Sequence, residues 1–302
     1  MHFDWKAIPS FGVAGNFTGH LEQAGEAGDF AHVKTAEASA PKALFPTYIP
    51  PLPEGQSAVP GESAAVPGTA GASRVPPFLH VFPFDSDFII FPKGEEKLQI
   101  EPECAVVFEA DWQEGKLVSL TPLCFGASND CSIRKAGAKK ISEKKNWGAC
   151  SKGFSSRYIP LTGFQAGCEL DGYRIASFLV RKGNVYAYGE DSPVAGYSYI
   201  WEKLTDWLVE KLNFQQDEGP AEDVHSYLLE VACPRRIFVS IGATRYTDYG
   251  EHHFLQDGDA AVVVLYPGSR YTAEQILRKV AANDLNGPDN TDISALWQTV
   301  RV

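Results

Sequence analysis

The residues with the clearest potential for chemistry are two glutamates, Glu101 and Glu103, which flank a proline. They stand in a β-rich run over 98–108 whose second half is continuously apolar. In a β-strand, residues i and i+2 point to the same face, so we expect the two carboxylates to project together. Adjacent carboxylates repel each other unless a cation or a shared proton neutralises them. Hard cations such as Mg²⁺ prefer oxygen ligands of this kind, although a Glu-x-Glu pair alone is also common on solvated strands.

A second polar group follows a run of small residues, where Asn129 and Asp130 precede Cys-Ser-Ile-Arg134. An Asn-Asp pair in such a place is usually a turn. It could also bring a third carboxylate to the glutamate pair. Three carboxylates with open water positions would make a Mg²⁺ site for an oxygen-rich substrate.

Two further residues could act on a substrate. Lys152 precedes a glycine, which lets the backbone approach a neighbour closely, and an ammonium there could stabilise developing negative charge. His20 lies near Glu22, and a histidine beside a carboxylate can act as a general base toward a bound water. The plain alternatives are an exposed lysine without a role and a histidine that only forms a structural hydrogen bond. The sequence has no GxSxG, P-loop or GxGxxG motif, so serine-hydrolase, P-loop and Rossmann functions lack support.

The elements that must position these residues are mostly short strands. Strand-like runs occur at 11–14, 87–92, 98–108, 174–180, 236–241 and 260–266. An amphipathic helix is predicted over 197–213, and a second helix over 272–282 with Thr272 as its N-cap. A short helix within 16–26 could have Thr18 as its cap. Because strands outnumber helices, we expect a β-rich α+β fold with few helices.

The composition limits the class of protein. The 302 residues carry a net charge of −11, which argues against a nucleic-acid binder, and no apolar run is long enough for a membrane span. Six cysteines lie far apart without a CxxC pair, so we expect a reduced, cytoplasmic protein. We expect a single domain over 1–302, with a flexible Pro/Gly/Ala-rich insertion at about 54–77.

The charge is distributed unevenly. Residues 134–157 hold eight Lys or Arg and one acid, a local balance of +7 that leaves −18 on the remainder. The simpler interpretation is a solvated basic loop. The alternative is a segment that meets a small carboxylate or phosphate, since the acidic remainder would repel a long polyanion.

The order of these motifs resembles the fumarylacetoacetate hydrolase (FAH) superfamily over about residues 10–268. The family's strand with two metal-binding glutamates matches Glu101-Pro-Glu103, and its Asn-Asp-x-Ser-x-Arg motif matches 129–134. Its later lysine in a Gly-rich segment matches Lys152. Its early Asn-aromatic-x-x-His motif matches Asn16 to His20.

The resemblance implies an FAH C-terminal-like mixed β-roll/β-sandwich and a homodimer. It implies Mg²⁺ (or Mn²⁺ or Ca²⁺) held by Glu101, Glu103 and Asp130. The substrate would be a small 2-oxo or β-dicarbonyl acid, activated through a metal-stabilised enolate for C–C hydrolysis, decarboxylation, hydration or isomerisation. Lys152 would add positive charge, and His20, with Glu22, would position or deprotonate water. The residues expected to contact the anionic carboxylate substrate are Asn129, Arg134, Thr244 and Arg245.

The sequence departs from the family at the catalytic histidine. Many relatives have a glutamate three residues after it, where this chain has Gln23, with Glu22 one position earlier. On a helix the i+2 side chain faces away from residue i, so Glu26 is an alternative partner if the segment folds back. The departure favours a second hypothesis, a catalytically inactive FAH-fold protein that binds a small anion or a protein partner. A purely structural protein would leave the glutamates without a metal.

Overall fold

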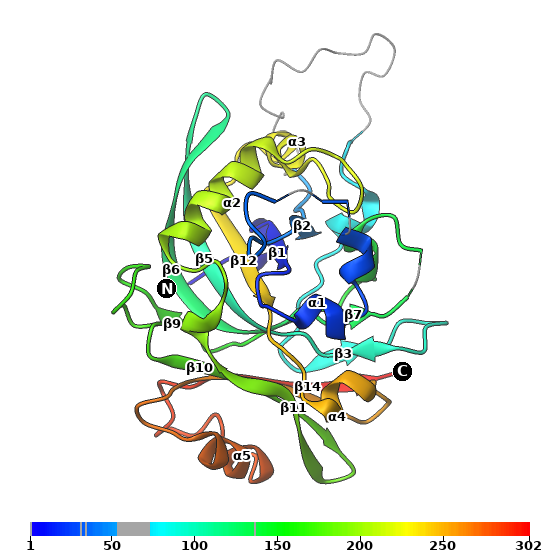
Figure 1. The fold of residues 1–302 in the computed structure, drawn as a ribbon, viewed down its shortest axis with the longest axis vertical. Helices are drawn as coiled ribbons and strands as arrows, with labels where there is room; N and C mark the ends of the chain where they lie inside the picture. The colour runs from blue at the N-terminus through cyan, green and yellow to red at the C-terminus, as the bar shows by residue number, and fades with distance from the viewer. Residues whose placement is uncertain (1, 31, 34, 53–72, 136) are drawn as a thin grey trace.

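A computed structural model describes residues 2–30, 32–33, 35–52, 73–135 and 137–302. Most of the insertion expected at about 54–77 lies outside these residues. Two sheets dominate the fold, with the larger one curled like half a barrel above the smaller one (Figure 1).

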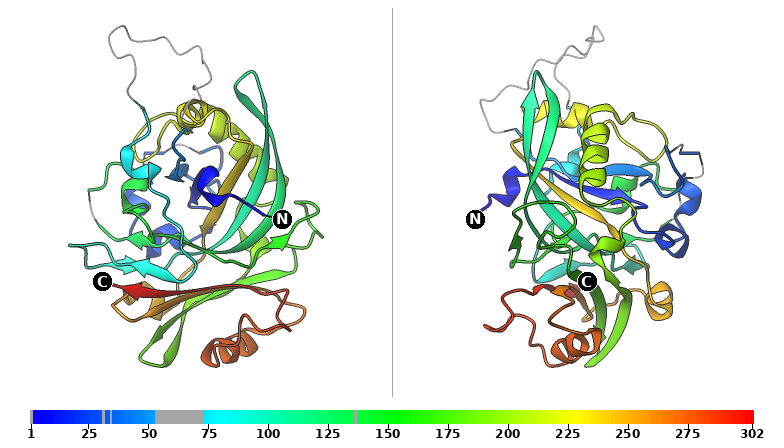
Figure 2. Two further views of the ribbon diagram at one scale, coloured as in Figure 1. Left: turned by 180° about the vertical axis from the view of Figure 1, so that it is seen from behind. Right: turned by 60° about the vertical axis from the view of Figure 1, so that its left-hand side comes forward.

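The larger sheet contains seven strands among the described residues, in the order β2-β1-β12-β5-β6-β8, with β9 also paired to β6. Pairing is antiparallel except between β1 and β12, which are parallel. Its strands are β1 (Ser10–Ala14), β2 (Ala43–Tyr48), β5 (Pro102–Gln113), β6 (Lys116–Asn129), β8 (Gly153–Phe154), β9 (Ile159–Pro160) and β12 (Arg236–Ala243). The β5–β6 hairpin is the longest pair and forms one wall of the half-barrel (Figure 2).

The smaller sheet has the order β11-β10-β13-β14-β3. Its strands are β3 (Phe88–Ile90), β10 (Tyr173–Arg181), β11 (Asn184–Pro193), β13 (Ala260–Pro267) and β14 (Ser294–Arg301). A separate two-stranded pair joins β4 (Leu98–Gln99) to β7 (Ser132–Ile133).

Short helices and turns pack against these sheets. The α-helices are α1 (His20–Gln23), α2 (Glu202–Phe214), α3 (Val224–Glu230), α4 (Asp248–His252) and α5 (Ala273–Ala281). The 3₁₀ turns are η1 (Trp5–Ala7), η2 (Ala27–Phe30), η3 (Pro77–His80), η4 (Ile141–Lys144) and η5 (Val194–Gly196). The α2 helix packs on β6 and β2, whereas α5 lies on the far side of the smaller sheet (Figure 1).

The main core fills the space between the two sheets and α2. The helix contributes Leu204, Leu208 and Leu212, which are fully buried with strand residues of both sheets. A second cluster joins α5, through Ile276 and Val280, to the opposite face of the smaller sheet. Burial of such apolar side chains is the dominant source of stability.

The structure confirms the β-rich α+β class and most of the expected strands and helices. Two boundaries differ. Helix α2 begins only at Glu202, because Trp201 before it has a φ of +57° and ends a turn rather than continuing a helix. Helix α1 has four residues and follows Gly19, whose φ is +87°, so the expectation that Thr18 caps it was wrong.

Candidate metal centre

The candidate site lies where two strand pairs meet end to end. The β5–β6 hairpin continues into the β4–β7 pair, but the ladder is interrupted at 100–101 and 130–131, which belong to no strand. Glu101 and Asp130 lie in this interruption, where the amide N of Asp130 donates to the carbonyl O of Glu101 over 3.0 Å. The expectation that Glu101 and Glu103 share one strand was therefore wrong, because β5 begins only at Pro102.

Three carboxylates nevertheless converge there. Each of Glu101, Glu103 and Asp130 offers an oxygen, and these oxygens lie within 4.8 Å of one another. All three residues are at most 3% exposed. We refer to them as the carboxylate triad. Its donor set consists of hard oxygens, the ligands that Mg²⁺, Mn²⁺ and Ca²⁺ prefer, so the triad could hold such an ion.

A bulge in β12 orients Glu103. The register shifts between Ser240 and Ala243, which lets the amide N of Gly242 donate to Oε2 of Glu103 over 2.8 Å. Gly242 has a φ of +118°, and an added Cβ would lie 3.2 Å from the carbonyl O of Val13. Glycine is therefore required at this position.

Buried cations surround two of the three carboxylates. Arg134 approaches Oε1 of Glu101 at 2.7 Å, and Lys145 forms ion pairs with both Glu101 and Asp130. Lys152 lies 3.1 Å from Oδ1 of Asp130. Two of these oxygens, Oε1 of Glu101 and Oδ2 of Asp130, accept no hydrogen bond of good geometry, although each lies 2.7 Å from a cationic nitrogen. A metal would compete with these cations for the two oxygens.

The electrostatic surroundings shift the pKa values of the two glutamates in opposite directions. Burial opposes ionisation of Glu101, but Lys145 and Arg134 outweigh it and hold its pKa well below the usual value. Burial together with the charges of Asp130 and Glu101 raises the pKa of Glu103 well above its usual value. Among the described residues no cation forms an ion pair with Glu103. It is the carboxyl of the triad that would gain most from a bound cation.

Both the side chain and the backbone of Lys152 are held by hydrogen bonds. Its Nζ donates to the carbonyl O of Cys131, and its own carbonyl O accepts from Nε2 of Gln298 over 3.1 Å. Gln298 also accepts through Oε1 from Asn129, over 3.0 Å. A Cβ on Gly153 would lie 2.3 Å from Gln298 Oε1, so the expected close backbone approach beside Lys152 is present. Burial lowers the pKa of Lys152, although Asp130 opposes this shift.

His20 is buried beside the triad. Its Nδ1 lies 2.9 Å from the carbonyl O of Thr244. Because a carbonyl can only accept, Nδ1 carries the proton and Nε2 is left as the basic nitrogen. Burial lowers the pKa of His20, partly offset by the charge of Glu101.

The two acids that could partner His20 differ in their burial. Glu22 is exposed, whereas Glu26 is buried and its charge acts on His20. The chain folds back after α1, where the amide N of Glu26 donates to the carbonyl O of Leu21. Glu26, the alternative partner that required the segment to fold back, is therefore the acid that lies near His20 in the site.

The four expected substrate contacts lie in different surroundings. Asn129 is fully buried and accepts a hydrogen bond from the amide N of Glu101, so it holds the strand interruption together. Arg134 contacts Gln99, Glu26 and Tyr246 as well as Glu101. The hydroxyl of Thr244 is buried without a hydrogen-bond partner. Arg245 is exposed and lies 3.5 Å from Glu190 at the surface.

The basic segment is not simply a solvated loop. Three of its lysines, Lys144, Lys145 and Lys152, are at most 3% exposed. Each forms an ion pair with a buried acid. Lys140 and Arg157 contact acceptors nearer the surface. Sequence reasoning missed the specific role of Lys145, although the excess of positive charge was visible. It also missed Gln298, which lies 169 residues from its partner Asn129 and carries no local pattern.

The space at the triad is small. A cavity of about 20 Å³ is lined by His20, Glu101, Glu103, Lys145 and Phe45, among others. This exceeds the roughly 10–15 Å³ that one water needs, so it has room for an ion or a water but not for an organic acid. Glu26 lines both this cavity and a neighbouring surface groove of about 390 Å³.

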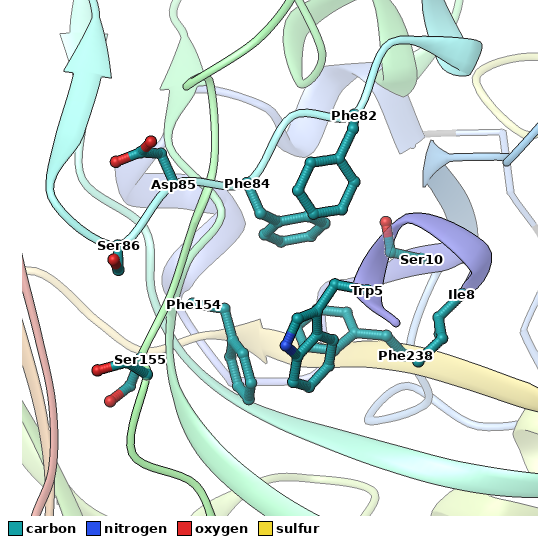
Figure 3. A pocket seen from close by; sticks show the side chains of 11 residues that line it. Trp5, Ile8, Ser10, Phe82, Phe84, Asp85, Ser86, Phe154, Ser155 and Phe238 are labelled. Carbon is teal, nitrogen blue, oxygen red and sulfur yellow. The ribbon is translucent and has the colours of Figure 1, made fainter. Parts of the chain in front are cut away.

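An aromatic pocket of about 200 Å³ lies elsewhere. The rings of Trp5, Phe82, Phe84, Phe154 and Phe238 surround it (Figure 3). It shares no lining residue with the triad, and its walls are apolar apart from a few hydroxyls and Asp85. Its chemistry differs from that of a site for a small anion.

Comparison with known proteins identifies the family of this sequence. A model described as a family of unknown function, DUF5718, matches residues 26–300. The chain belongs to this family. No curated protein matches the sequence. Among the described residues of this DUF5718 protein, no helix is long and apolar enough to cross a membrane.

Solved structures share its fold at low sequence identity. One is Cg1458, at 14% identity and a TM-score of 0.50, with 97% of this chain and 75% of that chain covered. Another is 2-keto-3-deoxy-D-arabinonate dehydratase complexed with magnesium and 2,5-dioxopentanoate, at 13% identity and a TM-score of 0.50, with 97% and 72% covered. A protein assigned to the fumarylacetoacetate hydrolase family from Yersinia pestis CO92 also matches, at 14% identity and a TM-score of 0.43, with 85% and 89% covered. The predicted similarity to FAH-superfamily proteins is confirmed at the level of the fold.

Proposed function

We propose that this protein is a Mg²⁺-dependent enzyme that acts on a small 2-oxo carboxylic acid, by C–C bond hydrolysis or decarboxylation. The observation that carries the proposal is the carboxylate triad, whose buried oxygens lie within 4.8 Å of one another. Burying three carboxylates close together costs free energy unless cations compensate their charge. The magnesium and oxo acid bound to the dehydratase of the same fold support this choice of cofactor and substrate class.

Glu101, Glu103 and Asp130 would hold the metal. When bound, a divalent ion would supply positive charge beside the oxygens of the substrate and stabilise negative charge that develops on them. Mn²⁺ or Ca²⁺ would suit the same oxygen ligands.

Lys152 would add a second positive charge on the opposite side of Asp130. Its ammonium is 1% exposed and held by Asp130 and a backbone carbonyl, so it needs no reorganisation to act. Such preorganised charges are worth about 10²–10³ in rate in other enzymes.

His20 would act on water. The carbonyl O of Thr244 accepts a hydrogen bond from Nδ1 of His20, so the basic Nε2 is not used in this contact. Burial lowers the pKa of His20, so the imidazole stays neutral and able to accept a proton. In a hydrolytic reaction His20 would remove a proton from the attacking water. A decarboxylase would not need this step.

A substrate must enter from the surface. The groove beside Gln23, Glu26 and Arg134 adjoins the small cavity, and Glu26 lines both. We propose that an acid reaches the triad through this groove, with Arg134 as its first cationic contact. The segment around α1 and η2 would shift to admit it.

A catalytically inactive anion-binding protein is the second candidate. The exposed Glu22 and the three cations already paired with the triad favour it. Turnover separates the two candidates, because an inactive protein would bind an anion without consuming it.

The test is a screen of 2-oxo acids with Mg²⁺, followed by absorbance at the enol band. Wild-type protein should consume at least one acid, and a chelator should abolish the activity. Lys152→Met should lower kcat by about 10²-fold or more. Lys279→Met, which removes a partner of Asp284 on α5, is the control and should retain activity. Binding of the acids without turnover of any would support the inactive protein instead.

A further inference from the structure

Lys145 lies at the place where the triad would hold a metal. Its Nζ forms an ion pair with Oε2 of Glu101 and lies 2.7 Å from Oδ2 of Asp130. It also lies 3.4 Å from the carbonyl O of Asp130. An ammonium within reach of three oxygens from two expected metal ligands occupies the same electrostatic position as a bound cation.

The backbone on both sides of Lys145 is anchored. Ser142 donates to Oε1 of Glu222 over 3.0 Å. Asn146 donates from Nδ2 to the carbonyl O atoms of Thr47 and Val81, over 2.8 and 3.0 Å. These contacts hold the backbone at Lys145 in place.

The local charge is compensated without a metal, even with Glu103 ionised. The acids in this region are Glu26, Glu101, Glu103 and Asp130, and four bases with side chains at most 8% exposed oppose them: Arg134, Lys144, Lys145 and Lys152. A divalent ion added beside all four bases would meet an ammonium at close range. Like charges at such a distance in a buried site repel strongly, so one ammonium must leave.

We infer that Lys145 is the resident counter-ion of the carboxylate triad and that a divalent metal binds by displacing its ammonium. The inference rests on the proposed metal site. Among the described residues, only Lys145 forms ion pairs with two triad members, so it is the cation whose removal frees the most ligand oxygens. Glu26, whose charge also acts on Lys145, is an alternative partner for the displaced ammonium.

The first test is a Mn²⁺ titration followed by electron paramagnetic resonance of the free ion. Lys145→Met should bind Mn²⁺ at least about tenfold more tightly than wild type, because no ammonium competes. Lys144→Met is the matched control, since Lys144 is the adjacent buried lysine and pairs with Glu26 and Asp29 instead of the triad. Its affinity should stay close to that of wild type.

The outcomes separate the inference from the metal site itself. Equal or weaker Mn²⁺ binding by Lys145→Met, with binding still lost in Lys145→Met/Glu103→Gln, would retain the site and overturn the displacement. Absence of Mn²⁺ binding in every variant would overturn both.

A second measurement uses wild-type protein and does not depend on the folding of a variant. Lys145 is 2% exposed, so an amine-acylating reagent should modify it slowly. Saturating Mn²⁺ should increase its modification several-fold, measured by mass spectrometry, while Lys152 stays protected. Unchanged protection of Lys145 with Mn²⁺ bound would show that the metal does not displace it.

Discussion

Single residues in this site differ mainly in how their charge is compensated. Arg134 is the most connected of them, because its guanidinium contacts two buried carboxylates and two neutral acceptors. Removing one partner of a buried ion pair leaves an uncompensated charge, which usually costs about 3–5 kcal/mol.

Arg134→Met should therefore lower the free energy of unfolding by about 3–5 kcal/mol, measured by urea denaturation. Arg245→Met is the control. Its side chain is about half exposed and its ion pair with Glu190 is 3.5 Å long, so the effect should stay below about 1 kcal/mol. Similar losses of stability from both substitutions would contradict the larger contribution expected of the buried ion pairs of Arg134.

Glu222 predicts a pH dependence of stability. It is 1% exposed, burial raises its pKa to about 8, and its Oε2 accepts no hydrogen bond. Between its ordinary pKa and about 8, the folded state keeps a proton that the unfolded state has lost. The contribution of Glu222 to stability is complete at low pH and is lost as the pH rises through about 8.

Glu222→Gln should remove this loss, which amounts to a slope of up to about 1.4 kcal/mol per pH unit in that window. Urea denaturation at several pH values measures it, with the exposed Glu218→Gln as control. A wild-type slope that Glu222→Gln leaves unchanged would mean that the proton belongs to another group.

At the level of elements, the contact between β8 and β14 positions the lysine of the site. Gly153 allows the amide of Gln298 to approach the backbone at Lys152. Gly153→Ala would push this amide away, and overpacking of this kind usually costs about 1–3 kcal/mol. Thermal unfolding should show the loss, whereas Gly28→Ala, where no atom lies within 4 Å of the added Cβ, should unfold close to wild type. An unperturbed Gly153→Ala would mean that Gln298 does not fix this strand.

The elements also explain which features the sequence could predict. Strands and helices with clear periodicity, such as the stripe of Leu204, Leu208 and Leu212, were predictable because their burial pattern is local. The interruption at Glu101 was not, because it depends on pairing with residues around Asp130 across the hairpin. The partnership of Lys145 with two acids is likewise a tertiary contact, and composition showed only the excess of charge.

For the whole molecule, the acidic balance and the basic segment are two parts of one arrangement. The segment places three lysines in an acidic interior, where they form ion pairs with Glu26, Glu101 and Asp130. The single domain and the cytoplasmic location expected from the sequence remain predictions, as does the homodimer implied by the family resemblance. Sedimentation analysis tests the dimer, and a monomer at micromolar concentration would contradict it.

The most direct test of the account is thermal unfolding of wild type and Glu103→Ala with Mn²⁺, with and without oxalate. Oxalate resembles the planar enolate of a 2-oxo acid. A ligand at 100 times its dissociation constant stabilises the folded state by about 2.7 kcal/mol, a readily measured shift. We predict that oxalate stabilises wild type only when Mn²⁺ is present and does not stabilise Glu103→Ala. No shift at saturating concentrations, or an equal shift in both proteins, would contradict a metal-dependent site for 2-oxo acids at the carboxylate triad.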